Sequence, residues 1–162
     1  IFKGIDIDFS YAFSTNTQFR SATSWVEATN TKTDLPLVNI PPLTINNQLQ
    51  FSIPSWNSFF VLLSSKKVFQ QKRFPNYNTV TTVVENGAKV DKMVDISTPP
   101  QGYHNLGLEL NWGPYSLFSS KVNVSLNVDN VLNASYRNYL NRLRFYADEI
   151  GRNIHVQIKI NH

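Results

Sequence analysis

The chain has 162 residues, no cysteine and a net charge of +4, and 16% of its residues are charged and 13% aromatic. The lack of cysteine excludes a disulfide framework and a cysteine-based metal site. The modest charge, without a recognisable binding motif, argues against a nucleic-acid partner. No apolar run approaches the roughly 20 residues that a membrane-spanning helix needs. The aromatic content and the many Asn, Ser and Thr residues instead favour an all-β protein, including one that crosses a membrane with strands of about 9–11 residues.

The first half of the chain predicts four strands, over residues 2–14, 18–29, 47–53 and 58–71. The first strand alternates strictly between apolar and polar residues, which is the period of a strand with two different faces. The fourth is a continuous apolar run, for which a buried helix is the alternative, but its β-branched and aromatic residues favour a strand. Residues 30–46 hold three prolines and cannot form a central strand. Residues 54–57 read as a tight turn.

The second half predicts three further strands around two long polar segments. Residues 72–102 form the first segment, with a small hairpin arm at 79–85. A strand over 103–112 follows, and Gly113-Pro114-Tyr115 is expected to turn the chain. The last two strands, 122–128 and 153–162, alternate almost without error: their even-numbered residues from Val122 to Val128 and from Ile154 to Ile160 are all aliphatic. We expect this aliphatic face to contact lipid.

The residues between and beside these two strands carry a family resemblance. Asp129-Asn130-Val131-Leu132 with Tyr136, followed by Gly151-Arg152-Asn153, resembles the C-terminal end of TonB-dependent outer-membrane receptors. The resemblance implies an all-β fold, an antiparallel transmembrane β-barrel segment. Residues 1–162 would supply about the last seven strands of a twenty-two-stranded barrel, whose internal plug and TonB box lie upstream. The chain departs from the family at its end, where Ile160-Asn161-His162 stands in place of a terminal aromatic residue. The alternation places His162 on the apolar face.

The connections between the predicted strands support a barrel independently. Short ones (14–17, 54–57, 113–119) alternate with long ones (30–46, 72–102, 130–152), which is typical of the periplasmic turns and extracellular loops of outer-membrane barrels. Seven strands would leave two open edges, which a bilayer does not tolerate. We therefore expect that the first and last strands do not pair with each other and that upstream strands cover both. The missing signal peptide likewise favours the tail of a longer polypeptide.

The resemblance also implies function, partners and location. The intact receptor would import a scarce solute across the bacterial outer membrane: a siderophore-iron complex, haem, another metal complex or a glycan. Its partners would be the rest of the barrel and its plug, the TonB-ExbB-ExbD system acting through the plug, outer-membrane lipid or lipopolysaccharide, and a surface lipoprotein. No cofactor, catalytic residue or metal ligand is predicted. The three histidines (His104, His155, His162) lack ligand spacing, and no nucleophile-and-base arrangement is found.

Candidate binding residues concentrate in the last loop, where arginines could hold a carboxylate or phosphate bidentately and tyrosines could stack. They are Arg137, Tyr139, Arg142, Arg144, Tyr146 and Asp148. The alternative is a loop whose charges pair internally. Polar residues predicted to line the lumen are Glu109, Asn111, Asn123, Asn127 and Asp129. Lys66, Lys67, Lys72 and Arg73 could meet lipopolysaccharide or simply be solvated. Trp25, Trp56 and Trp112 are predicted interface anchors.

Two other classes of protein remain open from the sequence. A small eight-stranded outer-membrane barrel with a structural or adhesion role would use the 79–85 arm as its eighth strand. A soluble β-sandwich acting as a binding module would bury its aliphatic faces against each other.

Overall fold

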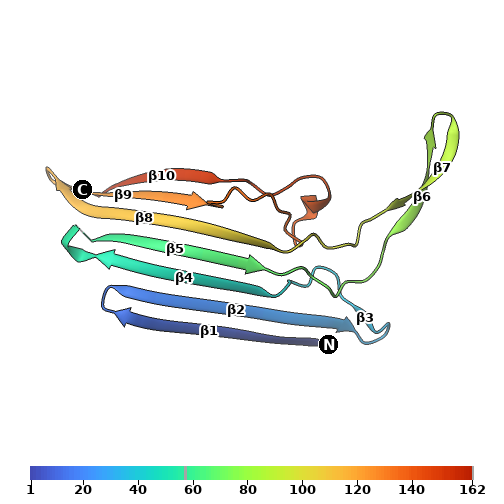
Figure 1. Cartoon of the computed structure of the whole chain (residues 1–162), viewed down its shortest axis with the longest axis horizontal. Helices are drawn as coiled ribbons and strands as arrows, with labels where there is room; N and C mark the ends of the chain where they lie inside the picture. Colours follow the sequence, from blue (N-terminus) through green and yellow to red (C-terminus); the bar gives the residue numbers. More distant parts are fainter. Residues whose placement is uncertain (57, 162) are drawn as a thin grey trace.

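The computed structural model describes residues 1–56 and 58–161, which form one large antiparallel sheet with a separate hairpin (Figure 1). The sheet order is β1-β2-β4-β5-β8-β9-β10. Its strands are β1 (Phe2–Ser14), β2 (Thr17–Asn30), β4 (Thr44–Ile53), β5 (Phe59–Val68), β8 (Tyr103–Leu117), β9 (Ser120–Asp129) and β10 (Asn153–Asn161). The short β3 (Leu35–Pro36) pairs with the end of β2, and β6 (Thr79–Glu85) pairs with β7 (Ala88–Val94). Two short 3-10 turns, η1 (Pro54–Trp56) and η2 (Arg142–Phe145), complete the described structure.

The seven predicted strands are all present, and the apolar run at 58–71 forms strand β5 rather than a helix. Of the turn predicted at 54–57, the first three residues form η1; Asn57 and the predicted facing of His162 lie outside the described residues. The arm at 79–85 is only half of the observed hairpin. Asn86 and Gly87 join it to β7 with φ of +52° and +80°, which is the type I′ turn that Asn-Gly favours.

The turn predicted at Gly113-Pro114-Tyr115 is wrong. Strand β8 continues through these residues to Leu117, with a shift of register against β9 between Trp112 and Tyr115. Gly113 has φ of +117°, a conformation that glycine adopts without penalty. The glycine therefore bends the strand as a bulge instead of ending it, and the chain reverses later, after Leu117.

The strand register gathers apolar residues from every strand on one side of the sheet. One row across all seven strands consists of Tyr11, Phe19, Leu49, Leu63, Leu108, Val128 and Ile154. We call this side the apolar face and the opposite side the polar face. The prediction that the even-numbered residues of 122–128 and 154–160 share one face is confirmed, because Val122, Val124, Leu126 and Val128 pair with Ile160, Ile158, Val156 and Ile154.

The apolar run is staggered from strand to strand, as in a barrel wall. On β1 it begins at Ile5, whereas on β10 it begins at Ile154, which lies in the row of Tyr11. The shift from residue 5 to residue 11 takes place over the six steps between the seven strands, or about one residue per step. With about 3.3 Å per residue along a strand and about 4.8 Å between strands, this stagger corresponds to a tilt of about 35°, within the usual range for membrane barrels.

No second layer covers the sheet among the described residues. Every residue of β1 and β10 is exposed, and Ile154, Val156, Ile158 and Ile160 keep 55–63% of their surface. The few buried apolar side chains include Val68, Tyr103 and Tyr139 near the long loops. Two alternatives from the sequence are thus not supported. The apolar faces do not pack against each other as in a sandwich, and β6 pairs only with β7 and adds no eighth strand to close a small barrel.

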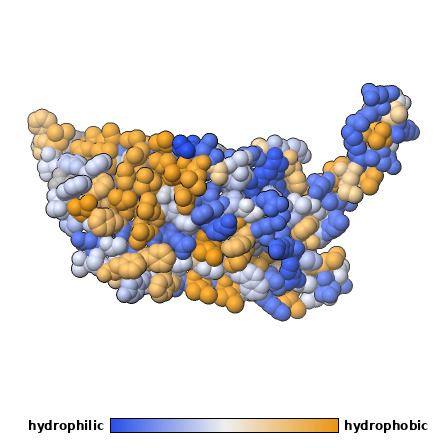
Figure 2. Space-filling view, in the orientation of Figure 1, coloured by the Kyte–Doolittle hydropathy of each residue, from blue (hydrophilic) through white to orange (hydrophobic). Residues whose placement is uncertain are grey.

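The connections sort by length to the two ends of the sheet (Figure 1). The short turns β1–β2, β4–β5 and β8–β9 lie at one end, which we call the short-turn end. The connections β2–β4, β5–β8 and β9–β10, together with the β6–β7 hairpin, lie at the long-loop end. Strand β1 starts at the long-loop end and β10 finishes at the opposite end, so the two edge strands run parallel to each other. Figure 2 shows hydrophobic residues gathered nearer the short turns and hydrophilic residues over the long loops and the hairpin.

Candidate functional site: the long-loop end and the polar face

The residues that carry the family resemblance link the two ends of the last loop, 130–152. The buried Asn130 side chain accepts from Ala134 N and donates to Ala134 O, both at 2.9 Å. The two halves of the motif meet at Asn133, whose Oδ1 accepts from Arg152 N at 2.8 Å. A Cβ on Gly151 would lie 2.8 Å from that same oxygen, so any larger residue there would displace the Asn133 side chain. The motif therefore holds the loop in place where it leaves β9 and enters β10.

An ion pair links the two arms of this loop. Arg137 Nε donates to Asp148 Oδ1 at 2.7 Å, and the Ser135 hydroxyl donates to the other carboxylate oxygen. The hydrogen bond from Arg137, with a further one from Ser135, lowers the pKa of Asp148 below its ordinary value of 3.8. Both side chains remain partly exposed. Their main effect is to shape the loop, since pairs in contact with water contribute little to stability.

Arg144 is also engaged within the loop. Its guanidinium lies over the rings of Tyr139 and Phe145, 4.5 and 4.6 Å from their centroids, and donates to the Tyr139 carbonyl. Tyr139 itself is buried, with 5% of its surface exposed. Arginine over an aromatic face is a favourable cation–π arrangement. Arg144 and Tyr139 thus contact each other and other residues of the loop.

Of the six residues predicted to bind ligand, the structure gives four of them partners inside the loop: Arg137, Tyr139, Arg144 and Asp148. Two others project away from it. Tyr146 keeps 84% of its surface exposed, and Arg142, at the start of η2, is exposed with no hydrogen bond or ion pair to the rest of the described chain. Arg142 and Tyr146 are therefore exposed on a scaffold that the other four residues hold in shape, and ligand binding by any of the six stays a prediction.

The five residues predicted to line the lumen share the polar face. Glu109 pairs across strands with Asn127, and Asn111 donates to the Glu109 carboxylate at 2.6 Å. Asn123 is opposite Lys159, and Asp129 ends β9 opposite Asn153. The structure thus brings all five to one side of β8 and β9, while their contact with a lumen stays a prediction.

Sequence reasoning missed a second polar cluster on this face, formed by β1 and β2. Arg20 holds Asp8 through two hydrogen bonds of 2.7 and 3.2 Å. Gln18 donates to Ser10 at 2.9 Å beside it. A hollow of about 370 Å³ lies over these residues and the neighbouring β4. The alternation of the first strand marked Asp8 and Ser10 as facing one side, but only the pairing with β2 reveals their partners.

Another hollow, of about 400 Å³, lies on the polar face beneath the last loop, and its lining includes Lys66, Asp129, Tyr136 and Glu149. Lys66 was predicted to act together with Lys67, Lys72 and Arg73. The register separates the two neighbouring lysines, because Lys66 pairs with Asn105 on the polar face whereas Lys67 pairs with His104 on the apolar face. Sequence alone identified the cluster of charges but not this division.

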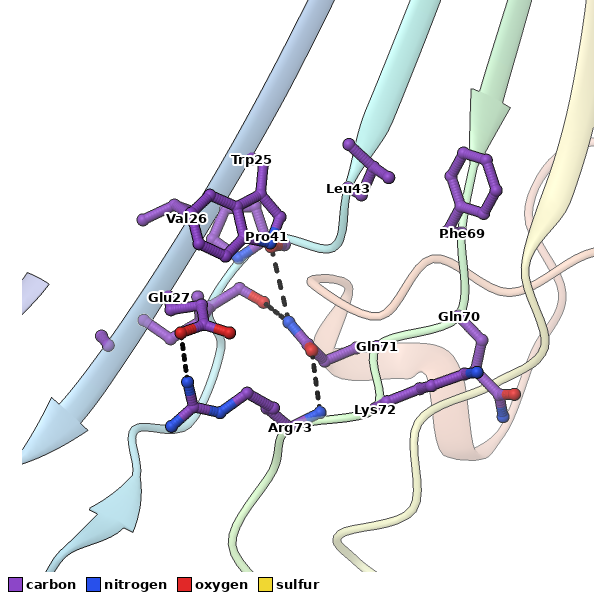
Figure 3. Close-up of a pocket in the computed structure, with 12 residues that line it drawn as sticks. Trp25, Val26, Glu27, Pro41, Leu43, Phe69, Gln70, Gln71, Lys72 and Arg73 are labelled. Atoms are coloured by element: carbon purple, nitrogen blue, oxygen red, sulfur yellow. Dashed lines mark hydrogen bonds and ion pairs between the residues drawn. The ribbon is translucent and has the colours of Figure 1, made fainter. Parts of the chain in front are cut away.

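A third hollow, of about 270 Å³, lies at the long-loop end between β2 and the segment after β5 (Figure 3). Arg73 forms an ion pair with Glu27 and donates to Thr29 Oγ1 at 3.1 Å. Gln71 donates to the Ile40 carbonyl at 2.9 Å. Figure 3 shows these polar side chains bridging the strand and the loop segments. Hydrogen bonds and an ion pair between the strand and the loop segments therefore cross the hollow. They leave few unpaired polar groups for a ligand.

The aromatic side chains mark two levels on the apolar face. Trp25, Leu43 and Phe69 lie side by side at the long-loop end (Figure 3). Trp56, Phe59 and Trp112 cluster at the short-turn end, with ring centroids 6.2 and 4.5 Å apart along the series. Phe59 and Phe69 are ten residues apart, or about 25 Å along the axis of a barrel whose strands tilt by about 35–45°. Aromatic girdles flank an apolar band of about that height in membrane barrels.

Within the described residues, no helix is both long and apolar enough to span a membrane. The described chain likewise contains no group of three or more histidine, aspartate or glutamate side chains placed to hold a metal ion.

The fold defines the class of structure: an all-β, antiparallel sheet of the kind found in the walls of β-barrels. Among solved structures, the chain is similar to the copper transporter OprC, with a TM-score of 0.74 over 97% of this chain and 17% sequence identity. The similarity covers 23% of that protein's length, so the chain spans under a quarter of it. No family model matches the sequence, and no curated protein matches it. At this identity the likeness establishes the fold.

Proposed function

We propose that this chain forms part of the barrel wall of a TonB-dependent outer-membrane transporter. The observation that carries the proposal is the apolar face that runs through all seven strands, staggered by about one residue per strand and flanked by aromatic side chains. A water-soluble protein would expose this face at a cost of about 25 cal/mol per Å², whereas lipid accepts it. The sorted loops, the residues at 129–136 and 151–153, and the likeness to a copper transporter support the same proposal.

The unpaired edges of β1 and β10 indicate which partner the chain needs, namely other strands of a barrel. Strands β1 and β10 run parallel, so they cannot close the sheet as another antiparallel pair, and their outer backbone groups need partners inside a bilayer. Other strands of the same barrel would provide them, and a plug would rest against the polar face. Energy from the TonB-ExbB-ExbD system would reach the solute through that plug. A surface lipoprotein would meet the long-loop end, and the cell location is the bacterial outer membrane.

The likeness and the chemistry of the last loop together support a proposal for the class of solute. The copper transporter OprC is named for a metal, and metal import fits the expected range of siderophore-iron, haem or other metal complexes, with a glycan as the remaining option. The exposed Arg142 and Tyr146 suit an anionic, partly aromatic chelate, because arginine binds carboxylates through paired hydrogen bonds. Such residues bind and orient the solute and catalyse no reaction.

Uptake assays test this function directly. Cells that lack the full-length gene should lose import of one scarce metal complex, and Arg142→Ala in the restored gene should raise the concentration needed for half-maximal uptake about tenfold, the equivalent of about 1.4 kcal/mol. Arg73→Ala, a loop arginine already paired with Glu27, serves as the control for general loop damage. Unchanged uptake of every metal complex and glycan in the deletion strain would contradict the proposal.

A further inference from the structure

The apolar face is not smooth: it contains a hollow of about 340 Å³ over β4, β5 and β8. Its walls are mainly the leucines of the central rows, Leu49, Leu63, Leu106 and Leu108. Its floor is lowered by two short polar side chains, Asn47 and Ser65, which face each other across the two strands. The hollow is thus a depression lined mainly by leucines, and it opens on the outer side of the apolar face.

A cation stands at the edge of this hollow nearer the long loops. Lys67 lies two residues beyond Ser65 on β5, and its cross-strand neighbours on the apolar face are Ile45 and His104. The His104 ring is in turn hydrogen-bonded to Ser65, with Nε2 and Oγ 2.8 Å apart. Within the described residues the Lys67 ammonium group has no hydrogen bond and no ion pair, and no carboxylate lies beside it on this face. The loop arginines Arg73 and Arg137, by contrast, each have an acidic partner.

The level of Lys67 matches that of lipid headgroups. Phe69, one of the aromatic residues at the long-loop end, is two residues further along, or about 5 Å higher along a tilted strand. A lysine on the lipid side costs about 2–4 kcal/mol at the middle of the bilayer but about 0–1 kcal/mol near its surface. Its long stem allows the ammonium group to reach the polar layer while the methylenes stay against the wall.

We propose that this hollow binds a phosphate-bearing lipid of the leaflet at the long-loop end. One acyl chain fills the depression between the leucines, and the Lys67 ammonium donates to the lipid phosphate, with the His104 ring beside it. Charge complementarity selects the occupant, since an unpaired cation beside a nearly apolar hollow matches an anionic head on an apolar chain. The inference rests on the proposed function, because it requires that the apolar face be in a membrane.

The test compares two neighbouring lysines on opposite faces in the full-length receptor. The protein is stripped of lipid in a neutral detergent and titrated with phosphatidylglycerol, with lipid A, or with phosphatidylcholine as a reference without net charge, and bound lipid is counted by native mass spectrometry. The unmodified receptor should retain both anionic lipids in preference to phosphatidylcholine. Lys67→Gln should reduce that preference about fivefold, as expected for about 1 kcal/mol per basic residue near a charged surface.

Lys66→Gln is the matched control, because Lys66 faces the polar side and should leave the preference unchanged. Ser65→Phe fills the hollow and should weaken retention of all three lipids, including the neutral one. Equal preferences in the Lys66 and Lys67 variants would overturn the inference, and so would a receptor without any preference, or a co-purifying protein over the hollow. Since none of these outcomes alters solute uptake, they are separate from failure of the proposed function.

Discussion

At the scale of single residues, the side of the sheet on which a residue lies decides what it costs to replace. Val124 and Ile158 face each other across β9 and β10 on the apolar face, whereas their neighbours Asn123 and Gln157 lie on the polar face. A difference of one position in the sequence thus separates the face proposed to contact lipid from the polar face. For loop residues, the cost of replacement depends mainly on local hydrogen bonds and ion pairs.

A lysine placed on the apolar face should destabilise the barrel. We expect Val124→Lys or Ile158→Lys in the full-length receptor to lower the free energy of unfolding by up to about 2–4 kcal/mol, the cost at the middle of the bilayer, because the charge would enter the apolar band between the two aromatic levels. Urea titration of the receptor folded into lipid vesicles measures this. Asn123→Lys and Gln157→Lys, one residue away, should change stability by less than about 1 kcal/mol. Equal losses on the two faces would contradict the assignment of the apolar face to lipid.

The Asp148–Arg137 pair predicts a pH dependence of the last loop. The pKa of Asp148 is lowered in the folded loop by the hydrogen bond from Arg137. The ionised carboxylate therefore stabilises the loop fully at pH values above 3.8, the ordinary pKa of an aspartate. This stabilisation is lost as the pH falls through the lowered pKa of Asp148. Hydrogen exchange in 130–152 should accelerate at strongly acidic pH. In Arg137→Gln the acceleration should begin at higher pH, and an unshifted profile would show that the pair is not formed.

At the scale of elements, the bulge in β8 depends on one glycine. Gly113 combines φ of +117° with a Cβ position only 2.7 Å from the Val122 carbonyl oxygen. Any side chain must therefore displace backbone of the neighbouring strand as well as adopt a strained conformation. The bulge allows β8 to continue to Leu117 and places Tyr115 opposite Val122 on the apolar face.

Gly113→Ala should therefore destabilise the β8–β9 pair by about 3 kcal/mol or more, from backbone strain and overpacking together. Gly87→Ala is the control. Gly87 also has positive φ, but nothing lies within 4 Å of its Cβ position and it belongs to the separate β6–β7 hairpin. That variant should leave unfolding of the barrel unchanged. Urea unfolding of the two full-length variants, followed by tryptophan fluorescence, compares them, and equal stability of both would rule out the close contact as a constraint.

At the scale of the whole molecule, the sheet has two unpaired edges and an uncovered apolar face. Every residue of β1 and β10 is exposed, and the described residues provide no strand to pair with the outer edge of either. Exposed edges of this length and hydrophobicity are templates for pairing with another chain. We therefore expect the sheet to be stable beside further strands of a barrel, with its long-loop end in water.

The isolated 162-residue chain should consequently fail to form a monodisperse, water-soluble monomer. We expect aggregation in buffer and dispersal only in detergent, which size-exclusion chromatography and amide NMR spectra would reveal. A matched sample with Lys at Val124, Leu126, Val156 and Ile158 should be more soluble, because it breaks the apolar face. A soluble monomer of the unmodified chain with well-dispersed amide signals would refute the membrane assignment.

Local alternation in the sequence determined much of this structure, because the two faces of a strand are set by the backbone alone. It located the seven strands, the shared face of β9 and β10, and the sorting of short and long connections. Only the tertiary structure decided how the strands meet. The run 58–71 has no alternation, so nothing local showed that Leu62 would join the polar hollow while Leu63 joined the apolar row. The bulge at Gly113, the internal pairing of the last loop and the separation of Lys66 from Lys67 likewise depend on contacts between residues distant in sequence, and a local pattern does not contain them.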